Sequence, residues 1–210
     1  MEGIRTLLPY TSWAWNVLGI SFALNAFIAH QGGLNGKGDL PKPLLRVALL
    51  LYEIAAPSAL LVSFVISYAI WPNIIRQGGS TANIKATRTL IWHNANLMMA
   101  LAEIVLLGGI PVKLEHFAVA PIFGTIYVLV TWSLMHYWKP SAGPQFLYFF
   151  FDTTLGMTAT YAILVLLAVM LSFYGLFALV DLLLIYFGGG IVSRLVFVIF
   201  TCTMVCRFRD

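Results

Sequence analysis

Charged residues are scarce in this sequence: Asp, Glu, Lys and Arg together make up only 10% of its 210 residues. Hydrophobic residues make up 60%, and the mean hydropathy is +0.90. A soluble globular domain carries about 25% charged residues, because its surface must be hydrated. The scarcity of charge therefore excludes an ordinary soluble domain and predicts an integral membrane protein.

Cysteine is nearly absent, since only Cys202 and Cys206 occur, one helical turn apart. That spacing fits packing on one face of a helix and fits neither a disulfide framework nor a closed zinc site. The histidines and acidic residues show no HExxH or comparable ligand spacing, and no glycine-rich phosphate loop precedes a helix. The sequence thus predicts no metal ion and no cofactor.

The net charge of +4 is modest and is spread through short loops, with no basic stripe interleaved with aromatic residues. This pattern excludes nucleic acid as a partner and favours membrane lipid head groups. Lys and Arg are slightly more numerous on the side of the N-terminus, so the positive-inside rule favours a cytosolic N-terminus. The endoplasmic reticulum, plasma and organelle membranes all remain open.

Long apolar runs follow one another along the chain. A spanning helix needs ~20 apolar residues, and backbone in lipid must satisfy its own hydrogen bonds, so these runs predict helices. We expect an all-α, polytopic transmembrane helix bundle with about six spans, of which the first is retained and not cleaved as a signal peptide. The expected ranges are 13–29, 44–71, 90–110, 117–138, 155–187 and 191–206.

The breaks between these runs come from glycine and proline. Residues 31–43 read as a loop, and Pro72 is expected to end the second helix. The fifth run is too long for a single upright span, so it either breaks at Gly175 or tilts. The sixth run is short for a span.

Polar residues inside the third run are the best functional clue. His93, Asn96, Ala100 and Glu103 fall along one stripe of a helix with 3.6 residues per turn, so their polar groups are expected to face inward together. Polar groups in a membrane cost several kcal/mol unless they have partners or face a cavity. Something in the bundle must therefore compensate this stripe.

Topology predicts which of these groups meet. The first, third and fifth helices begin on the same side of the membrane, so Thr11, His93 and Asp152 are expected at one level of the bilayer. A hydroxyl and an imidazole are the ingredients of covalent acyl transfer, in which His removes the hydroxyl proton and later protonates the leaving group.

The same residues carry a resemblance to a known family. The chain resembles the androgen-induced membrane hydrolases, the FAR-17a-like family, over roughly residues 8 to 185. The resemblance rests on Tyr10-Thr11-Ser12-Trp13, on His93, Asn96 and Glu103, on Tyr127 and Trp132, and on Pro144-Gln145-Phe146-Leu147. It implies a multi-pass threonine hydrolase that cleaves fatty acid esters of hydroxy fatty acids, with Thr11 as nucleophile and His93 as base. Residues 1–187 form the domain that resembles the family, and residues 188–210 match nothing in it.

Each candidate also has a structural interpretation. Thr11 is either the nucleophile or, with Ser12, an N-cap. Asn94 and Asn96 either donate to an oxyanion or tie helices together. Glu103 is too far along the helix to orient His93 and is expected to partner Glu53, Tyr127 or a water.

Asp152 is the last supporting residue, and it either orients His93 or caps the fifth helix. The leading hypothesis is an intramembrane lipid esterase with Thr11 as nucleophile and His93 as base. Two alternatives stay open: a non-catalytic subunit of a membrane assembly that contacts protein partners through residues 188–210, and a carrier of protons or a small solute with a wet path from His93 to Glu103 and Glu53.

Overall fold

The computed structural model describes residues 8–35, 40–106, 110–134, 148–186 and 190–208. These residues form helices and connecting segments, with no strand among them. The α-helices are α2 (Tyr10–Asn35), α3 (Lys42–Val65), α4 (Trp71–Arg76), α5 (Ala82–Lys85), α6 (Thr87–Leu106), α7 (Val119–Ser133), α9 (Met157–Tyr186) and α10 (Ile191–Val205). A π-helix, η1 (Ile66–Ile70), joins α3 to α4, and three short 3₁₀ turns are η2 (Leu114–His116), η3 (Phe149–Phe151) and η4 (Thr153–Leu155).

The predicted all-α helix bundle is confirmed, and each predicted run corresponds to one of the longer helices. Among the described residues four helical segments, against about six predicted spans, are long and apolar enough to cross a membrane: Tyr10–Gly32, Lys42–Arg76, Leu114–Ser133 and Met157–Tyr186. Helix α6 is not in this group, and α10 is shorter. The longest of these segments, Lys42–Arg76, passes through η1 and α4.

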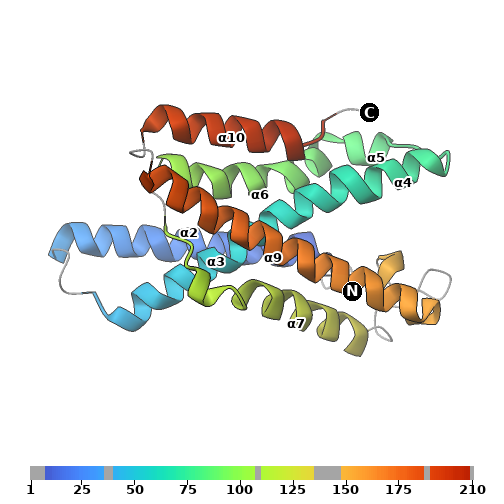
Figure 1. Cartoon of the computed structure of the whole chain (residues 1–210), viewed down its shortest axis with the longest axis horizontal. Helices are drawn as coiled ribbons and strands as arrows, with labels where there is room; N and C mark the ends of the chain where they lie inside the picture. The colour runs from blue at the N-terminus through green and yellow to red at the C-terminus, as the bar shows by residue number, and fades with distance from the viewer. Residues whose placement is uncertain (1–7, 36–39, 107–109, 135–147, 187–189, 209–210) are drawn as a thin grey trace.

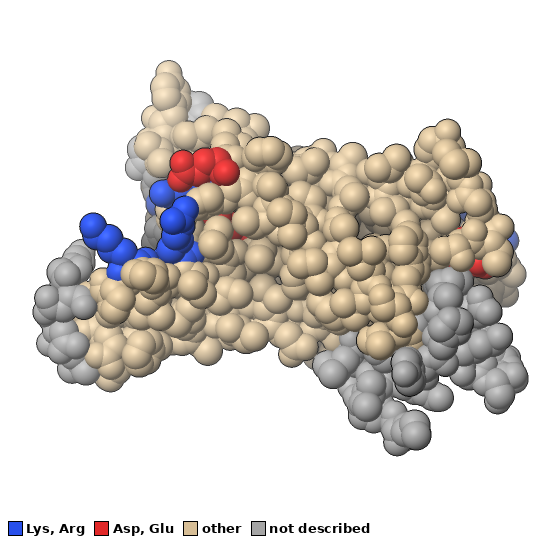
Figure 2. Space-filling model, turned by 90° about the horizontal axis from the view of Figure 1, so that it is seen from below, with Lys and Arg blue, Asp and Glu red and all other residues tan. Residues whose placement is uncertain are grey.

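The long helices run roughly along one axis, with successive helices alternating in direction (Figure 1). The first turns of α2, α6 and α9 are directed toward the same end of the bundle, as are the last residues of α7 and α10. We call this the α2-start end. On the face drawn in Figure 2, charged side chains gather near the two ends, and the surface between them is uncharged.

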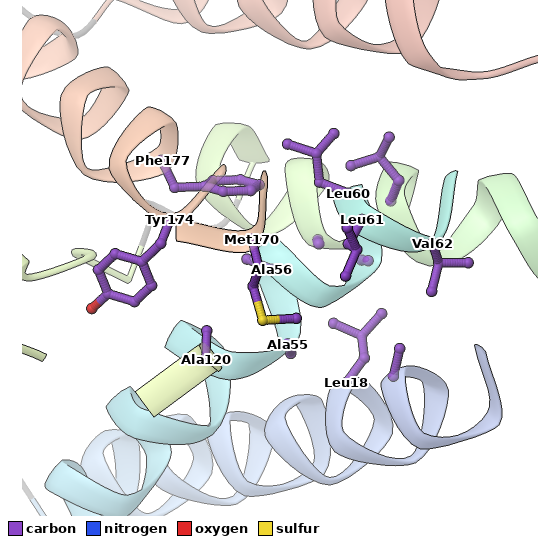
Figure 3. Packing of buried hydrophobic residues seen from close by; sticks show 14 of the residues in the cluster. Leu18, Ala55, Ala56, Leu60, Leu61, Val62, Ala120, Met170, Tyr174 and Phe177 are labelled. Atoms are coloured by element: carbon purple, nitrogen blue, oxygen red, sulfur yellow. The ribbon is translucent and has the colours of Figure 1, made fainter. Parts of the chain in front are cut away.

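Helix α3 is the centre of the bundle, because it contacts α2, α6, α7, α9 and α10. Its alanines make this possible: Ala55, Ala56 and Ala59 are fully buried, and small side chains let neighbouring helices approach closely. Figure 3 shows Ala55 and Ala56 of α3 beside Ala120 of α7, with Tyr174 and Phe177 of α9 nearby.

Two predicted helix ends differ from the structure. Helix α2 continues through Gly32 to Asn35, so the first part of the predicted 31–43 loop is helical. The second helix does not end at Pro72, because the chain widens into η1 and resumes as α4 with the proline in its first turn. Proline is tolerated there since the first N–H groups of a helix have no intrahelical partner.

Residues at and just after the end of α10 form hydrogen bonds with the π-helix η1. In η1 the Trp71 N–H donates to the Ile66 carbonyl, five residues back, so the next carbonyl, that of Ser67, faces Pro72, which has no N–H. The Arg207 Nη1 donates to that carbonyl at 3.1 Å, and the Ser67 hydroxyl donates to the Val205 carbonyl at 2.6 Å. The guanidinium also lies over the Trp71 ring, 5.0 Å from its centroid.

The fifth predicted run is a single helix, α9, that continues through Gly175 without a break. A Cβ added at Gly175 meets no heavy atom within 4 Å, so this glycine is not required by close packing. Cys202 of α10 and Cys206, the residue that follows this helix, are free thiols and pack, partly buried, against the core, as their spacing predicted.

Candidate functional site

A cavity of about 80 Å³ lies between α3, α7 and α9 and is bordered by the start of α2 and by the segment that precedes α9. Its wall is almost entirely apolar, and Leu61, Val62 and Met170, which line it, are seen in Figure 3. The lining residues are Tyr10, Thr11, Leu61, Val62, Val65, Ile66, Ile70, Gly124, Tyr127, Val128, Tyr148, Phe150, Phe151, Ile163, Leu166, Leu167 and Met170. An apolar cavity with a few hydroxyl groups suits an acyl chain that carries a polar group, such as an ester, at one end.

Thr11 belongs to the wall of this cavity, which we call the Thr11 cavity, and its side chain is only 4% exposed. The expectation that Thr11 and Ser12 cap the helix is wrong, because α2 already begins at Tyr10 and Ser12 N–H donates to the Pro9 carbonyl at 2.9 Å. The Thr11 hydroxyl interacts with the phenol of Tyr148, which lines the same cavity. Thr11 is therefore a buried hydroxyl that faces apolar space.

Two further phenols in the wall already have partners outside it. The Tyr10 hydroxyl lies 2.9 Å from the Ser58 hydroxyl, and the Tyr127 hydroxyl donates to the Leu8 carbonyl at 2.7 Å. The rings of Tyr10 and Tyr127 meet edge to face, with centroids 4.9 Å apart. These contacts hold the first turn of α2 against α7, and so they fix where Thr11 sits.

His93 is not part of the cavity wall. Its backbone carbonyl accepts a hydrogen bond of 2.5 Å from the Ser63 hydroxyl, on a different side of α3 from Val62 and Val65. Within the described residues no hydrogen bond joins His93 to Thr11, although α2 and α6 meet nearby, where the Trp15 indole donates to the Trp92 carbonyl at 2.8 Å. The two predicted catalytic residues thus share one end of the bundle but not one surface.

The polar stripe of α6 faces inward, as predicted. Asn96 is fully buried, Glu103 is 6% exposed and His93 is half-buried. One polar atom of each, His93 Nδ1, Asn96 Nδ2 and Glu103 Oε2, is buried without a hydrogen-bond partner among the described residues. We call these three residues the α6 row. The expected partners of Glu103 are engaged elsewhere, Tyr127 with Leu8 and Glu53 with the segment before α7.

Asn94 has a clear role in packing. Its side-chain amide donates to the Arg207 carbonyl at 3.1 Å, which ties α6 to the end of α10. This contact favours the helix-tying interpretation of Asn94 over an oxyanion role. Asn96 differs, because its Oδ1 accepts from the Leu97 N–H at 2.8 Å while its Nδ2 has no partner in the described part of the chain.

Asp152 acts as a cap, although of η4 and not of the fifth helix itself. Its Oδ1 accepts from the Thr154 N–H at 2.9 Å and from the Thr154 hydroxyl at 2.6 Å. Both hydrogen bonds lower the pKa of the Asp152 carboxyl, and the bond from the Thr154 hydroxyl has the larger effect. Both contacts are local, so Asp152 orients the turn before α9.

A polar cluster that the sequence did not predict lies at the other end of the bundle. Glu53 of α3 is completely buried and accepts from the Lys113 N–H at 2.7 Å, and its other oxygen lies 2.8 Å from His116 Nδ1. The Tyr174 hydroxyl of α9 donates to the Lys113 carbonyl at 2.7 Å. We call Glu53, His116 and Tyr174 the Glu53 cluster. The sequence contains a signal for this pair. A buried carboxylate in an apolar run requires hydrogen-bond donors, and His116 lies just before the apolar run that becomes α7.

Within the described ranges, no group of three His, Cys, Asp or Glu side chains is close enough to hold a metal ion. Comparison with protein-family models, with curated proteins and with solved structures finds no match to this chain. The resemblance to the FAR-17a-like family therefore stays a prediction. The fold defines the chain as a helix bundle with membrane-like helices.

Proposed function

We propose that this protein is a multi-pass integral membrane protein that binds one acyl chain of a membrane lipid in the Thr11 cavity and cleaves the ester of that lipid with Thr11. The observation that carries the proposal is the buried hydroxyl of Thr11 in a wall that is almost entirely apolar. An acyl chain entering from the bilayer already lies in hydrocarbon, so burying it in such a wall involves no loss of polar solvation.

The surface supports the membrane setting. Apolar residues of α9 such as Ile185, Leu182 and Leu164 are 71%, 56% and 56% exposed, which suits contact with lipid tails. The uncharged zone between the charged ends in Figure 2 has the same meaning. Four helical segments have the length and composition to cross the bilayer.

The proposed reaction proceeds in two steps. The Thr11 oxygen forms a bond to the ester carbonyl carbon, the bond from that carbon to the alcohol oxygen breaks, and the hydroxyl proton passes through a base to the leaving alcohol. Water then attacks the acyl-threonine, which releases a fatty acid and restores Thr11. His93 is the proposed base, and its Nδ1 has no partner among the described residues that would occupy it. Because His93 lies outside the cavity wall, the proton must cross to it through a water or after a turn of the ring.

The test is labelling with a fluorophosphonate probe together with release of fatty acid from an ester of a hydroxy fatty acid. Thr11→Ala is expected to abolish both, Thr11→Ser to retain the labelling, and His93→Gln to slow both by 10²-fold or more. Thr125→Ala is a matched control, because Thr125 is exposed on α7 and its hydroxyl donates to the Pro121 carbonyl of the same helix. Labelling that persists in Thr11→Ala overturns the assignment of the nucleophile.

The second candidate function is a non-catalytic membrane subunit, and a different observation favours it. Helix α10 leaves Val192, Val196 and Ile199 between 61% and 70% exposed on one face, and residues 188–210 include it. A protein partner seated there predicts that Val196→Trp dissociates an assembly in native mass spectrometry without altering esterase activity. A monomer in wild type and variant alike removes this candidate.

A further inference from the structure

Tyr148 is the phenol of the cavity wall that lies beside Thr11. Tyr148 and Thr11 line the same cavity, and the Tyr148 phenol interacts with the Thr11 hydroxyl and with the Tyr10 backbone. The other two phenols of the wall, Tyr10 and Tyr127, are held by Ser58 and by the Leu8 carbonyl. Tyr148 is therefore the phenol of this wall whose hydroxyl sits at the Thr11 end of the cavity.

The ring of Tyr148 is held firmly in that position. It stacks on Phe150 with centroids 5.2 Å apart and planes 5° apart, and it meets Phe151 edge to face at 5.6 Å. The Phe151 carbonyl in turn accepts from the Trp132 indole at 3.2 Å, which anchors the segment to α7. A donor that is fixed before the ligand arrives stabilises developing charge without reorganisation.

The hydroxyl pair of Thr11 and Tyr148 has two protons. A hydrogen bond between the two oxygens uses only one of these protons, and both side chains line the cavity, so the other proton can be donated to a ligand there. An acyl ester presents one strong acceptor at the matching place, its carbonyl oxygen, next to an apolar tail. The free proton of the pair and the carbonyl oxygen of an ester are complementary.

From this geometry we propose that the Tyr148 phenol donates a hydrogen bond to the carbonyl oxygen of the lipid ester bound in the Thr11 cavity. The inference rests on the proposed function and deepens it, because it selects carboxylic esters over ethers and alkanes of the same length. During attack by Thr11 the same proton faces the oxyanion that forms on the carbonyl oxygen. No proton leaves Tyr148 in this step, so the phenol is a donor and not an acid.

Burial raises the pKa of Tyr148 to about 12, which keeps the phenol protonated and able to donate over the physiological pH range. The pKa of an exposed phenol is already near 10, so this contribution secures the donor without creating it. The position of the ring, set by Phe150 and Phe151, determines where the hydrogen bond points.

The experiment compares an ester with its ether analogue in the full-length protein in detergent. Competition of each lipid against a diazirine-labelled fatty ester measures binding, and release of fatty acid measures turnover. For wild type we expect binding of the ester to be about 10-fold tighter than that of the ether, as for a hydrogen bond of roughly 1.4 kcal/mol. Tyr148→Phe keeps the ring and should bind both lipids equally.

Turnover in Tyr148→Phe should fall by about 10²-fold, with little change in KM relative to kcat, as when an oxyanion donor is removed. Tyr161→Phe is the matched control, because Tyr161 is 61% exposed on α9 and away from the cavity. If Tyr148→Phe retains the preference for the ester, the inference is wrong. Absent turnover in wild type with an intact preference overturns the esterase reaction alone, since the binding readout does not depend on it.

Discussion

Two buried glutamates on neighbouring helices meet opposite fates in this bundle. Glu53 of α3 is completely buried, and both of its oxygens have partners, the Lys113 N–H and the His116 ring. Glu103 of α6 is 6% exposed, and its Oε2 has no partner in the described part of the chain. Buried carboxylate oxygens that are hydrogen-bonded, as in Glu53, are compatible with a stable fold. A buried oxygen without a partner, as in Glu103, lowers the stability of the fold unless another interaction compensates it.

The surroundings of the two residues extend this contrast. The Glu53 cluster joins α3, η2 and α9, so it fixes the connection that leads into α7. The α6 row instead repeats the same deficit at His93, Asn96 and Glu103. One region is closed and structural, and the other presents a line of unsatisfied groups for which water or a ligand is the expected complement. The position of a polar residue in an apolar run thus does not by itself indicate a function, whereas the satisfaction of its hydrogen bonds does.

The largest expected effect is at Glu53. Glu53→Leu removes an acceptor from the Lys113 N–H and from His116, so it should lower the free energy of unfolding by roughly 3–5 kcal/mol. The measurement is thermal unfolding in detergent, with Glu115→Leu as control, because the Glu115 side chain is 67% exposed. A shift no larger than that of Glu115→Leu would show that the Glu53 cluster does not stabilise the fold.

The same substitution should act in the opposite direction at Glu103. Glu103→Leu removes a buried oxygen that has no partner, so the free energy of unfolding is expected to rise by about 1 kcal/mol. Unfolding of Glu103→Leu and Glu53→Leu is measured side by side. Losses of equal size at the two positions would mean that Glu103 is satisfied in the membrane, and the contrast would disappear.

The cavity is tested by adding one methyl group. A Cβ at Gly124 meets Met170 Sδ at 3.4 Å, so Gly124→Ala fits and fills part of the cavity. It should stabilise α7 by roughly 0.5–1 kcal/mol, because glycine is unfavourable inside a helix, and it should weaken binding of the diazirine-labelled ester.

Gly175→Ala is the control for Gly124→Ala, since its Cβ meets nothing within 4 Å in α9. It should give the same gain in unfolding free energy and leave lipid binding unchanged. Equal lipid binding in Gly124→Ala and Gly175→Ala would show that the lipid does not bind in the cavity and would contradict the proposed function.

The smallest effect is expected at Asp152, which stands outside both regions. The pKa of its carboxyl is lowered in the folded state by Thr154, so the stability it contributes is present above the unfolded pKa of about 3.9 and is lost as pH falls through the folded pKa. Melting temperatures of wild type and Asp152→Asn should therefore differ slightly at pH 6 and converge below about pH 4. A difference in melting temperature that increases toward acid pH would have the opposite sign and would exclude a stabilising cap at Asp152.

Sequence patterns predicted most of the fold because hydrophobic runs are long and unambiguous. The stripe of His93, Asn96 and Glu103 was also predictable, since a helical period places these residues on one face. The end of the second helix was not, because the outcome at Pro72 depends on Arg207, which donates to Ser67 from 140 residues away. Tertiary contacts of this kind are invisible to local patterns.

The site was less predictable than the fold. Topology correctly brought Thr11 and His93 to one end of the bundle, but whether they share a cavity depends on how α3 is rotated, and no pattern in the sequence specifies that rotation. The role proposed for Tyr148 was not predicted for a similar reason, because the cavity arises from side chains of several helices that leave space between them. The pairing of Glu53 with His116 could have been found by asking which residue satisfies a carboxylate in an apolar run.

The π segment has a consequence for the order of events during synthesis. The ribosome makes Ser67 140 residues before Arg207, which at 5–20 residues per second is a delay of roughly 7 to 28 seconds. For that interval the Ser67 carbonyl lacks the hydrogen-bond donor that Arg207 later supplies. The wall of the cavity formed by Ile66 and Ile70 is therefore settled only when the last-made helix described here docks.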